Sequence, residues 1–281
     1  MTALRRSALC FLVALGASGE NLDFDLMAPV VVQRRLAAVR ETTAEREHAL
    51  RDLFIEAGCS DDNLVEQKVK HSQTSNVICS MPGQTESTII VGAHLDCVKV
   101  GKGVVDNWSG ASLLPSLFQS LKKSPHRHNF FFIGFTDEER GLVGSKFYVD
   151  QLKKEKRKLI RAMVNLDSLG TGTTKMESER GDKRLMKALI TVATANKFPL
   201  QVVNMMRPTA RARARSDSDS FQDWRIPTVI LHSLTDETYR ILHSLRDRMD
   251  AIRFADYYDS YRLIAAYLVY LDYALDTEPV K

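Results

Sequence analysis

Short apolar runs alternate along the chain with longer segments in which apolar residues recur at helical spacing. Strand-like runs cover residues 64–69, 75–81, 87–94, 129–135, 161–167, 200–206 and 227–233. Segments with helical spacing cover residues 33–57, 109–123, 141–156, 182–197 and 254–275. This order predicts an α/β fold with a mixed, mainly parallel β-sheet flanked by helices on both faces. Because no repeat or long linker divides the chain, we expect a single domain over residues 20–281.

Residues 1–19 have the pattern of a cleavable secretory signal peptide. Arg5 and Arg6 precede an apolar core from Ala8 to Leu15, and small residues follow at positions 17–19. We therefore expect a secreted or periplasmic protein. No later segment approaches 18 uninterrupted apolar residues, so we expect no stable membrane association once the signal is removed.

Composition narrows the class of protein only a little. A hydrophobic fraction of 44% in 281 residues is ample for a packed core. The net charge is +4 with basic residues spread along the chain, so we expect no nucleic-acid partner. Signal removal would leave Cys59, Cys79 and Cys97. Both a Cys59–Cys79 disulfide and three free thiols fit the sequence.

Four of the apolar runs end in residue types that ligate metals or transfer protons. These residues are His94 with Asp96, the acidic run Asp137, Glu138 and Glu139, then Asp167, and finally His232. One acidic strand end is usually the polar start of a loop. Because the carboxyl ends of parallel strands meet at one edge of a sheet, four such ends predict a functional site there.

A fifth candidate lies in a glycine-flanked loop between the first two of these strands. The stretch GKGVVDNWSGAS (101–112) places Asp106 shortly before a predicted helix. A carboxylate here could bridge two cations, because each of its oxygens can bind one metal. The competing interpretation is a helix N-cap.

Six blocks resemble, in the same order, those of the co-catalytic double-zinc exopeptidases, a family that includes secreted bacterial leucyl aminopeptidases and glutamate carboxypeptidases. The blocks are GAHLDCV, VVDNWSGAS, FTDEERGLVGS, VNLDSLG, SDSDSFQDWRIPT and HSLRDRMDAI. The resemblance implies the zinc-exopeptidase (phosphorylase/hydrolase-like) fold and two zinc ions per chain. It makes His94 and Asp167 ligands of one zinc and Glu139 and His243 ligands of the other, with Asp106 bridging them.

The same resemblance makes Glu138 the general base that acts on a metal-bound, bridging water, and makes Asp96 the carboxylate that orients the His94 imidazole. Neighbouring side chains at a strand end point in different directions, so Glu139 can face a metal while Glu138 faces the water. Asp137 is given no catalytic role.

Two histidines are candidates for the last ligand position. Strand-end logic favours His232, whereas the family block favours His243, and we follow the block because loops commonly supply ligands. Ser218 stands where the family often has histidine, so substrate preference is not carried over. The other histidines, His48, His71, His126 and His128, have no partners in the pattern and are expected at the surface.

The resemblance implies peptide substrates and, first, an aminopeptidase that releases N-terminal amino acids. A zinc carboxypeptidase is the alternative, because Arg207, Arg211, Arg213 and Arg215 could bind a terminal carboxylate, although a solvated basic loop explains them more simply. Glutaminyl cyclases, which use one zinc, and metal-free binding domains share the fold. The full set of ligand types argues against a binding domain, and DNWSG and DEERGLVGS resemble peptidase sequences. The sequence does not indicate an oligomeric state.

Overall fold

One mixed β-sheet organises the residues that this computed structural model describes, which are 10–14, 21–204 and 215–277. In that part of the chain eight strands lie in the order β3–β4–β6–β5–β7–β10–β8–β9. Their bounds are β3 (Leu64–Lys68), β4 (Ser75–Met81), β5 (Thr88–His94), β6 (Asn129–Phe135), β7 (Ile160–Leu166), β8 (Lys175–Glu177), β9 (Gln201–Val203) and β10 (Thr228–His232). The predicted fold class is confirmed.

The four central strands, β6, β5, β7 and β10, are mutually parallel. Their residues are almost all buried, as expected for strands that are covered on both faces. In register, His94 pairs with Phe135 and Leu166 pairs with Leu231. The four strands therefore end side by side, and the segments that follow them leave from one edge of the sheet.

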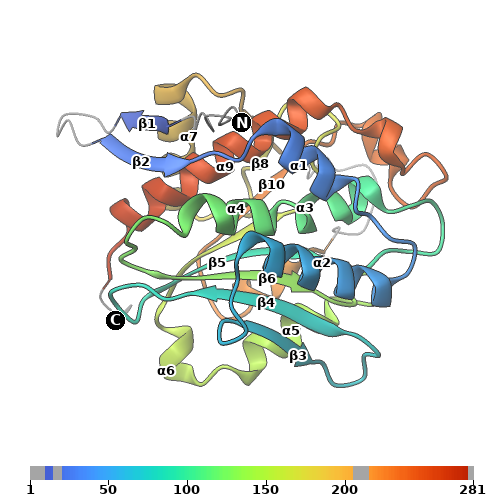
Figure 1. Ribbon diagram of the computed structural model, residues 1–281, viewed down its shortest axis with the longest axis horizontal. Coiled ribbons are helices and arrows are strands. Elements are labelled where there is room, and N and C mark those ends of the chain that lie inside the picture. The colour runs from blue at the N-terminus through green and yellow to red at the C-terminus, as the bar shows by residue number, and fades with distance from the viewer. Residues whose placement is uncertain (1–9, 15–20, 205–214, 278–281) are drawn as a thin grey trace, which may run out of the picture.

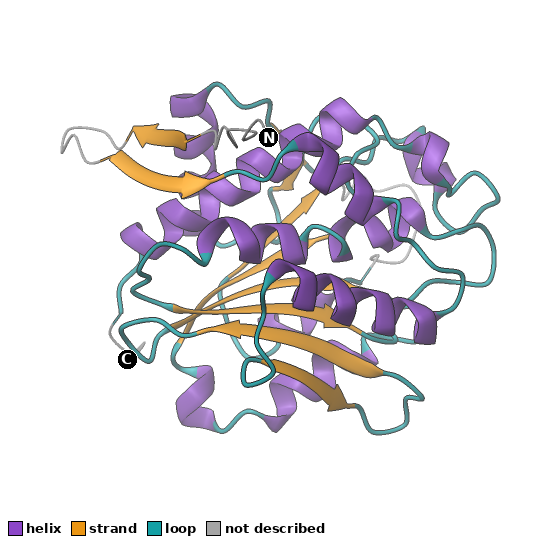
Figure 2. Cartoon of the chain, in the orientation of Figure 1, coloured by secondary structure: helices purple, strands orange, loops and turns teal. Residues whose placement is uncertain are grey.

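Helices cover both faces of the sheet (Figure 1, Figure 2). One face packs against α2 (Thr43–Ala57), α4 (Leu114–Leu121), α7 (Lys183–Asn196) and α9 (Phe254–Ala274). The other face packs against α5 (Val143–Gln151) and α8 (Asp217–Gln222), where the rings of Phe135, Tyr148 and Phe221 lie 6.0–6.2 Å apart between centroids. The carboxyl edge of the sheet is left to loops.

The single helix predicted over residues 33–57 is wrong, because the chain forms two helices there, α1 (Pro29–Leu36) and α2. Thr42 and Glu45 make a reciprocal capping box at the start of α2: the Glu45 amide donates to Thr42 Oγ1 at 3.2 Å, and the Thr42 amide donates to Glu45 Oε2 at 3.1 Å. The T-x-x-E spacing of Thr42 and Glu45 marks this helix start in the sequence, but the prediction considered only the apolar positions.

Two of the other four predicted helices also divide, whereas the segments predicted at 182–197 and 254–275 each form one helix, α7 and α9. Residues 104–121 form η1 (Val104–Trp108), α3 (Ser109–Ala111) and α4, and a short α6 (Lys154–Arg157) follows α5. Two 3-10 turns, η2 (Thr238–Ile241) and η3 (Met249–Ala251), lie between β10 and α9. The three-residue strand β8 was not predicted, because so short a segment carries no periodic signal.

Two histidines that were expected at the surface are buried. His48 and His71 are exposed, as predicted, but His126 and His128 are not. The burial of His128 is explained by Asp272 from α9. The Asp272 carboxylate lies 3.1 Å from His128 Nδ1 and accepts the backbone amides of Arg127 and His128. A partner 144 residues away leaves no trace in the local pattern.

Some predictions fall mostly outside the described residues. Of the predicted signal peptide only β1 (Cys10–Ala14) is described, paired antiparallel with β2 (Asn21–Asp25). Arg207, Arg211 and Arg213 also lie outside the described residues. Among the helices of the described segments, none is both long enough and apolar enough to cross a bilayer.

A disulfide joins Cys59, just after α2, to Cys79 in β4, and Cys97 carries a free thiol. Of the two possibilities that the sequence left open, the bridge is the one found. It closes a loop across 20 residues and ties α2 to the sheet.

Removing this bridge should lower the free energy of unfolding by about 3 kcal/mol, because the unfolded chain regains the entropy of the loop. The variant is Cys59→Ala with Cys79→Ala, and Cys97→Ala is the control that leaves the bridge intact. Urea denaturation of oxidised protein measures the difference. A double variant as stable as the control would contradict the prediction.

Candidate metal centre

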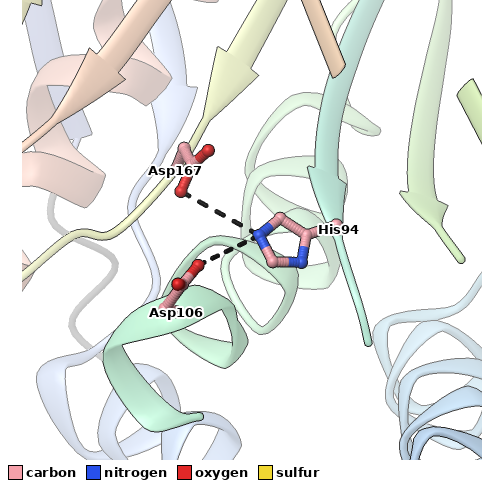
Figure 3. Close-up of side chains that lie close together, drawn as sticks. All are labelled: His94, Asp106 and Asp167. Atoms are coloured by element: carbon pink, nitrogen blue, oxygen red, sulfur yellow. Dashed lines mark hydrogen bonds and ion pairs between the residues drawn. The ribbon is translucent and has the colours of Figure 1, made fainter. Parts of the chain in front are cut away.

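Three of the predicted residues converge at the carboxyl edge of the sheet (Figure 3). His94 ends β5, Asp167 follows β7, and Asp106 lies in η1. His94 Nε2 is 3.1 Å from Asp106 Oδ1 and 4.0 Å from Asp167 Oδ1. One ligand atom from each residue lies within 4.8 Å of the other two, a spacing that suits a metal ion. His94 and Asp106 are buried.

Asp106 also belongs to a second group of three. Its Oδ2 lies 3.1 Å from Nε2 of His243, and the same nitrogen is 2.9 Å from Glu139 Oε1. Glu139 follows β6, and His243 lies in the loop after η2. Asp106 thus presents one oxygen to each group, the arrangement that bridging two cations requires. The competing N-cap interpretation fails, because the residue at the N-cap of α3 is Trp108 and no cap bond involves Asp106.

Asn107 fixes the Asp106 loop against the end of β7. Its Nδ2 donates to the carbonyl oxygen of Leu166 at 2.8 Å, and its Oδ1 accepts the amides of Gly110 at 3.0 Å and Ser168 at 3.2 Å. Gly110 is required for this approach, since a Cβ there would lie 2.6 Å from Asn107 Oδ1 and from the Leu166 carbonyl oxygen. Sequence reasoning missed Asn107, although it lies next to Asp106 in the quoted block.

Asp96 does more than the sequence predicted. Its Oδ1 lies 3.4 Å from His94 Nδ1, while Nε2 of the same ring lies near Asp106. The same carboxylate accepts the backbone amides of Glu138 at 3.0 Å and Glu139 at 3.1 Å. Asp96 therefore hydrogen-bonds the acidic turn and lies beside the imidazole, and outer contacts of this type are common around metal ligands.

Burial and crowding of carboxylates perturb the titration of the site. Burial, with nearby Asp217 and Asp167, raises the pKa of Glu138 to about 9, and burial with Asp106 raises that of Glu139 to about 7. Hydrogen bonding to Asp106 raises the pKa of His243 to about 9. Burial opposes ionisation of Asp106, yet the hydrogen bonds from His243 and His94 keep its pKa below the usual range.

The raised pKa values mean that the metal-free site binds protons, which offset the negative charge of its carboxylates. A divalent cation could bind in place of these protons. Imidazole nitrogens and carboxylate oxygens are donors that zinc accepts. The residues present at this edge therefore fit zinc.

The remaining candidates lie apart from these two groups. His232 is buried, its Nδ1 accepts the amide of Leu234 at 3.1 Å, and burial lowers its pKa to about 4. The structure therefore brings His243, and not His232, to the site. Asp137 pairs with Arg140 at 2.8 Å. Ser218 is fully buried, with its hydroxyl 2.7 Å from that of Ser216.

Comparison with curated proteins finds related sequences over part of the chain. The chain is 37% identical over 103 residues to an aminopeptidase of Pseudomonas aeruginosa (strain UCBPP-PA14). That match covers 36% of this chain but only 19% of the relative, so the chain matches about a fifth of that protein's length.

Solved structures share the fold at low sequence identity. The Legionella pneumophila LapA aminopeptidase superposes with a TM-score of 0.76 at 19% identity, over 89% of this chain and 73% of that one. A zinc aminopeptidase from Bacillus subtilis superposes with a TM-score of 0.62 at 24% identity, and the match covers 69% of this chain and 49% of that one. The Fimbriiglobus ruber glutaminyl cyclase superposes with a TM-score of 0.67 at 20% identity, and the match covers 86% of this chain and 93% of that one.

The low sequence identities to solved structures show only the fold, whereas a family model assigns the chain to a family. The model of peptidase family M28 matches residues 76–268, well over half of the chain, and this range contains all of the metal-site residues described above. The chain therefore belongs to peptidase family M28.

Proposed function

We propose that this protein is a zinc-dependent aminopeptidase that releases N-terminal amino acids from peptides with the help of two zinc ions. The observation that carries the proposal is the Asp106 carboxylate, which offers one oxygen to each of two groups of ligand-type side chains. The family assignment supports peptide hydrolysis. The Pseudomonas aminopeptidase and the Bacillus zinc aminopeptidase support the choice of reaction and metal.

In this proposal His94 and Asp167 hold the first zinc, Glu139 and His243 hold the second, and Asp106 bridges them. Zinc bound there would lower the pKa of water toward about 7 and polarise the scissile carbonyl. The protein supplies the other parts of the chemistry: rigid ligands on strand ends, and acids that move protons.

Glu138 is the proposed general base. Its amide is fixed by Asp96, and its side chain is partly buried near the proposed ligands Asp167 and Glu139. Divalent cations nearby would favour the ionised carboxylate and so reverse the rise in its pKa. Glu138 then takes the proton of the attacking water and passes it to the leaving amine, so that one carboxyl group serves both steps.

The charge around Glu138 supports an aminopeptidase over a carboxypeptidase. Asp217 lies near Glu138 and is not a proposed zinc ligand, so its carboxylate can attract the free ammonium of a peptide and repel a terminal carboxylate. Two arginines near this region, Arg180 and Arg215, are both paired with Asp219.

Export from the cytoplasm is part of the proposal. The N-terminal pattern of residues 1–19 predicts a signal peptide, and the Cys59–Cys79 disulfide supports an oxidising compartment such as the periplasm or the extracellular medium.

Mass spectrometry of a free-ended peptide mixture tests the proposed reaction directly. The mixture is incubated with zinc-loaded protein, and a chelator-treated sample is the control. We expect a chelator-sensitive ladder shortened from the amino end. Shortening from the carboxyl end would favour the carboxypeptidase, while cyclisation of N-terminal glutamine without any ladder would favour a glutaminyl cyclase. Either result would overturn the aminopeptidase proposal.

Replacing the proposed base should separate catalysis from metal binding. Glu138→Gln removes the proton acceptor but no proposed ligand, so we expect normal zinc content and a kcat lowered by about 10²- to 10⁴-fold. Asp137→Asn is the matched control, because this neighbouring acid pairs with Arg140 and not with the metal site. Nearly full turnover in Glu138→Gln would show that another group is the base.

Zinc uptake by the metal-free protein should release protons and tighten as pH rises. Zinc binds deprotonated ligands, whereas the pKa of Glu139 is raised to about 7 and that of His243 to about 9. Below these values zinc must displace protons, so apparent affinity rises through pH 7 and levels off above pH 9. Calorimetry near pH 6 in two buffers of different protonation enthalpy measures the release, and a binding heat independent of buffer would contradict the prediction.

A further inference from the structure

The loop that carries His243 has little support of its own. It lies between two 3-10 turns, and the His243 side chain is 53% exposed, with a backbone φ of +54° in the left-handed region. The ligands of the other group, by contrast, are held by the sheet: His94 ends β5 and Asp167 follows β7. Some other contact must therefore fix the position of His243 relative to Asp106.

Asp247 makes that contact. It lies four residues after His243, is 1% exposed, and reaches across to the loop that contains Asp106. Its Oδ1 accepts the amide of Val105 at 2.7 Å and its Oδ2 accepts the amide of Asp106 itself at 3.2 Å. Its backbone carbonyl accepts the amide of Lys102 at 2.7 Å. Three hydrogen bonds thus join the two loops.

The close approach of the loops depends on a glycine. Gly101 has a φ of +86°, and a Cβ at this position would lie 2.3 Å from the carbonyl oxygen of Ser244 and 3.3 Å from Cβ of Asp247. Within the second loop, the Asp247 amide donates to that same Ser244 carbonyl at 3.0 Å, which closes a turn directly after His243. The backbone of one loop therefore rests on the backbone of the other.

On the opposite side Arg46 holds the Asp106 loop to the rest of the fold. This fully buried guanidinium donates to the carbonyl oxygens of Lys102 and Leu95, and its charge lies near the carboxylates of Asp247 and Asp106. The Asp106 loop is thus anchored by Arg46 and by Asn107, independently of Asp247. Apart from the His243–Asp106 pair itself, the hydrogen bonds found between the described residues of these two loops all involve Asp247.

We infer that Asp247 is a positioning residue for one half of the metal centre. By accepting the amides of Val105 and Asp106 it holds His243 against Asp106, so that the zinc shared by Glu139, His243 and Asp106 depends on it. The zinc shared by His94, Asp167 and Asp106 does not. This inference rests on the two-zinc centre proposed above.

The variant Asp247→Asn tests the inference with little change of shape. The amide oxygen can still accept one of the two backbone amides, but its NH₂ group then faces the other donor. We expect one zinc to bind with wild-type affinity and the other to bind about 10- to 100-fold more weakly, which is the usual cost of losing such an outer contact. Asp250→Asn is the control, because that exposed carboxylate lies on the same segment and pairs with its neighbour Arg248.

Gly101→Ala provides an independent perturbation, because its added Cβ separates the two loops without altering the Asp247 carboxylate. Gly101→Ala should likewise weaken the binding of one zinc ion and leave the affinity for the other unchanged. The measurements are calorimetric zinc titration of the metal-free proteins and hydrogen exchange of the Val105 and Asp106 amides without metal, which should be faster in Asp247→Asn than in Asp250→Asn.

The outcomes separate this inference from the proposal on which it rests. Two-step zinc binding in the wild type with a weakened second step in both variants supports it. Unchanged binding, or equal weakening of both steps with a lower unfolding temperature of the metal-free variants, would overturn it and leave the two-zinc centre standing. Fewer than two zinc ions in the wild type would overturn the two-zinc centre, and this inference with it.

Discussion

The structure depends on one constraint, the placement of the buried Asp106 carboxylate between two imidazoles. His94 and His243 each lie 3.1 Å from a different oxygen of this group. A second carboxylate lies near each histidine, Asp167 near His94 and Glu139 near His243. Fixing a carboxylate so that both oxygens are used requires support from several directions, and the surrounding contacts supply it.

That support comes from polar side chains that bind the backbone of the loops. Asn107 ties the Asp106 loop to the end of β7, Asp96 holds the amides of Glu138 and Glu139, and Asp247 holds the amide of Asp106. Buried carboxylates of this kind would be costly in a protein interior without such hydrogen bonds. The same arrangement leaves an excess of negative charge that protons or divalent cations must offset, which agrees with the chemistry expected of a peptidase of family M28.

The sequence was sufficient for the parts of the site that follow directly from strand ends. Apolar runs predicted the central strands, and His94, Glu139 and Asp167 emerge where those runs end. His243 could be found only through the family block, because a loop ligand has no periodic signal. Apart from Asp96, which the family block supplied, the supporting contacts could not be predicted, since Asp247 binds amides 141 and 142 residues away and Asp272 buries His128 across 144 residues. Local patterns report which elements form, whereas these contacts depend on how the elements pack.

The proposed site holds two metal ions, one on either side of Asp106, and X-ray diffraction at the zinc absorption edge tests this arrangement most directly. Crystals of the zinc-loaded protein should show two anomalous peaks, one enclosed by His94, Asp106 and Asp167 and the other by Asp106, Glu139 and His243. A single peak, or zinc bound elsewhere on the chain, would contradict the two-metal site.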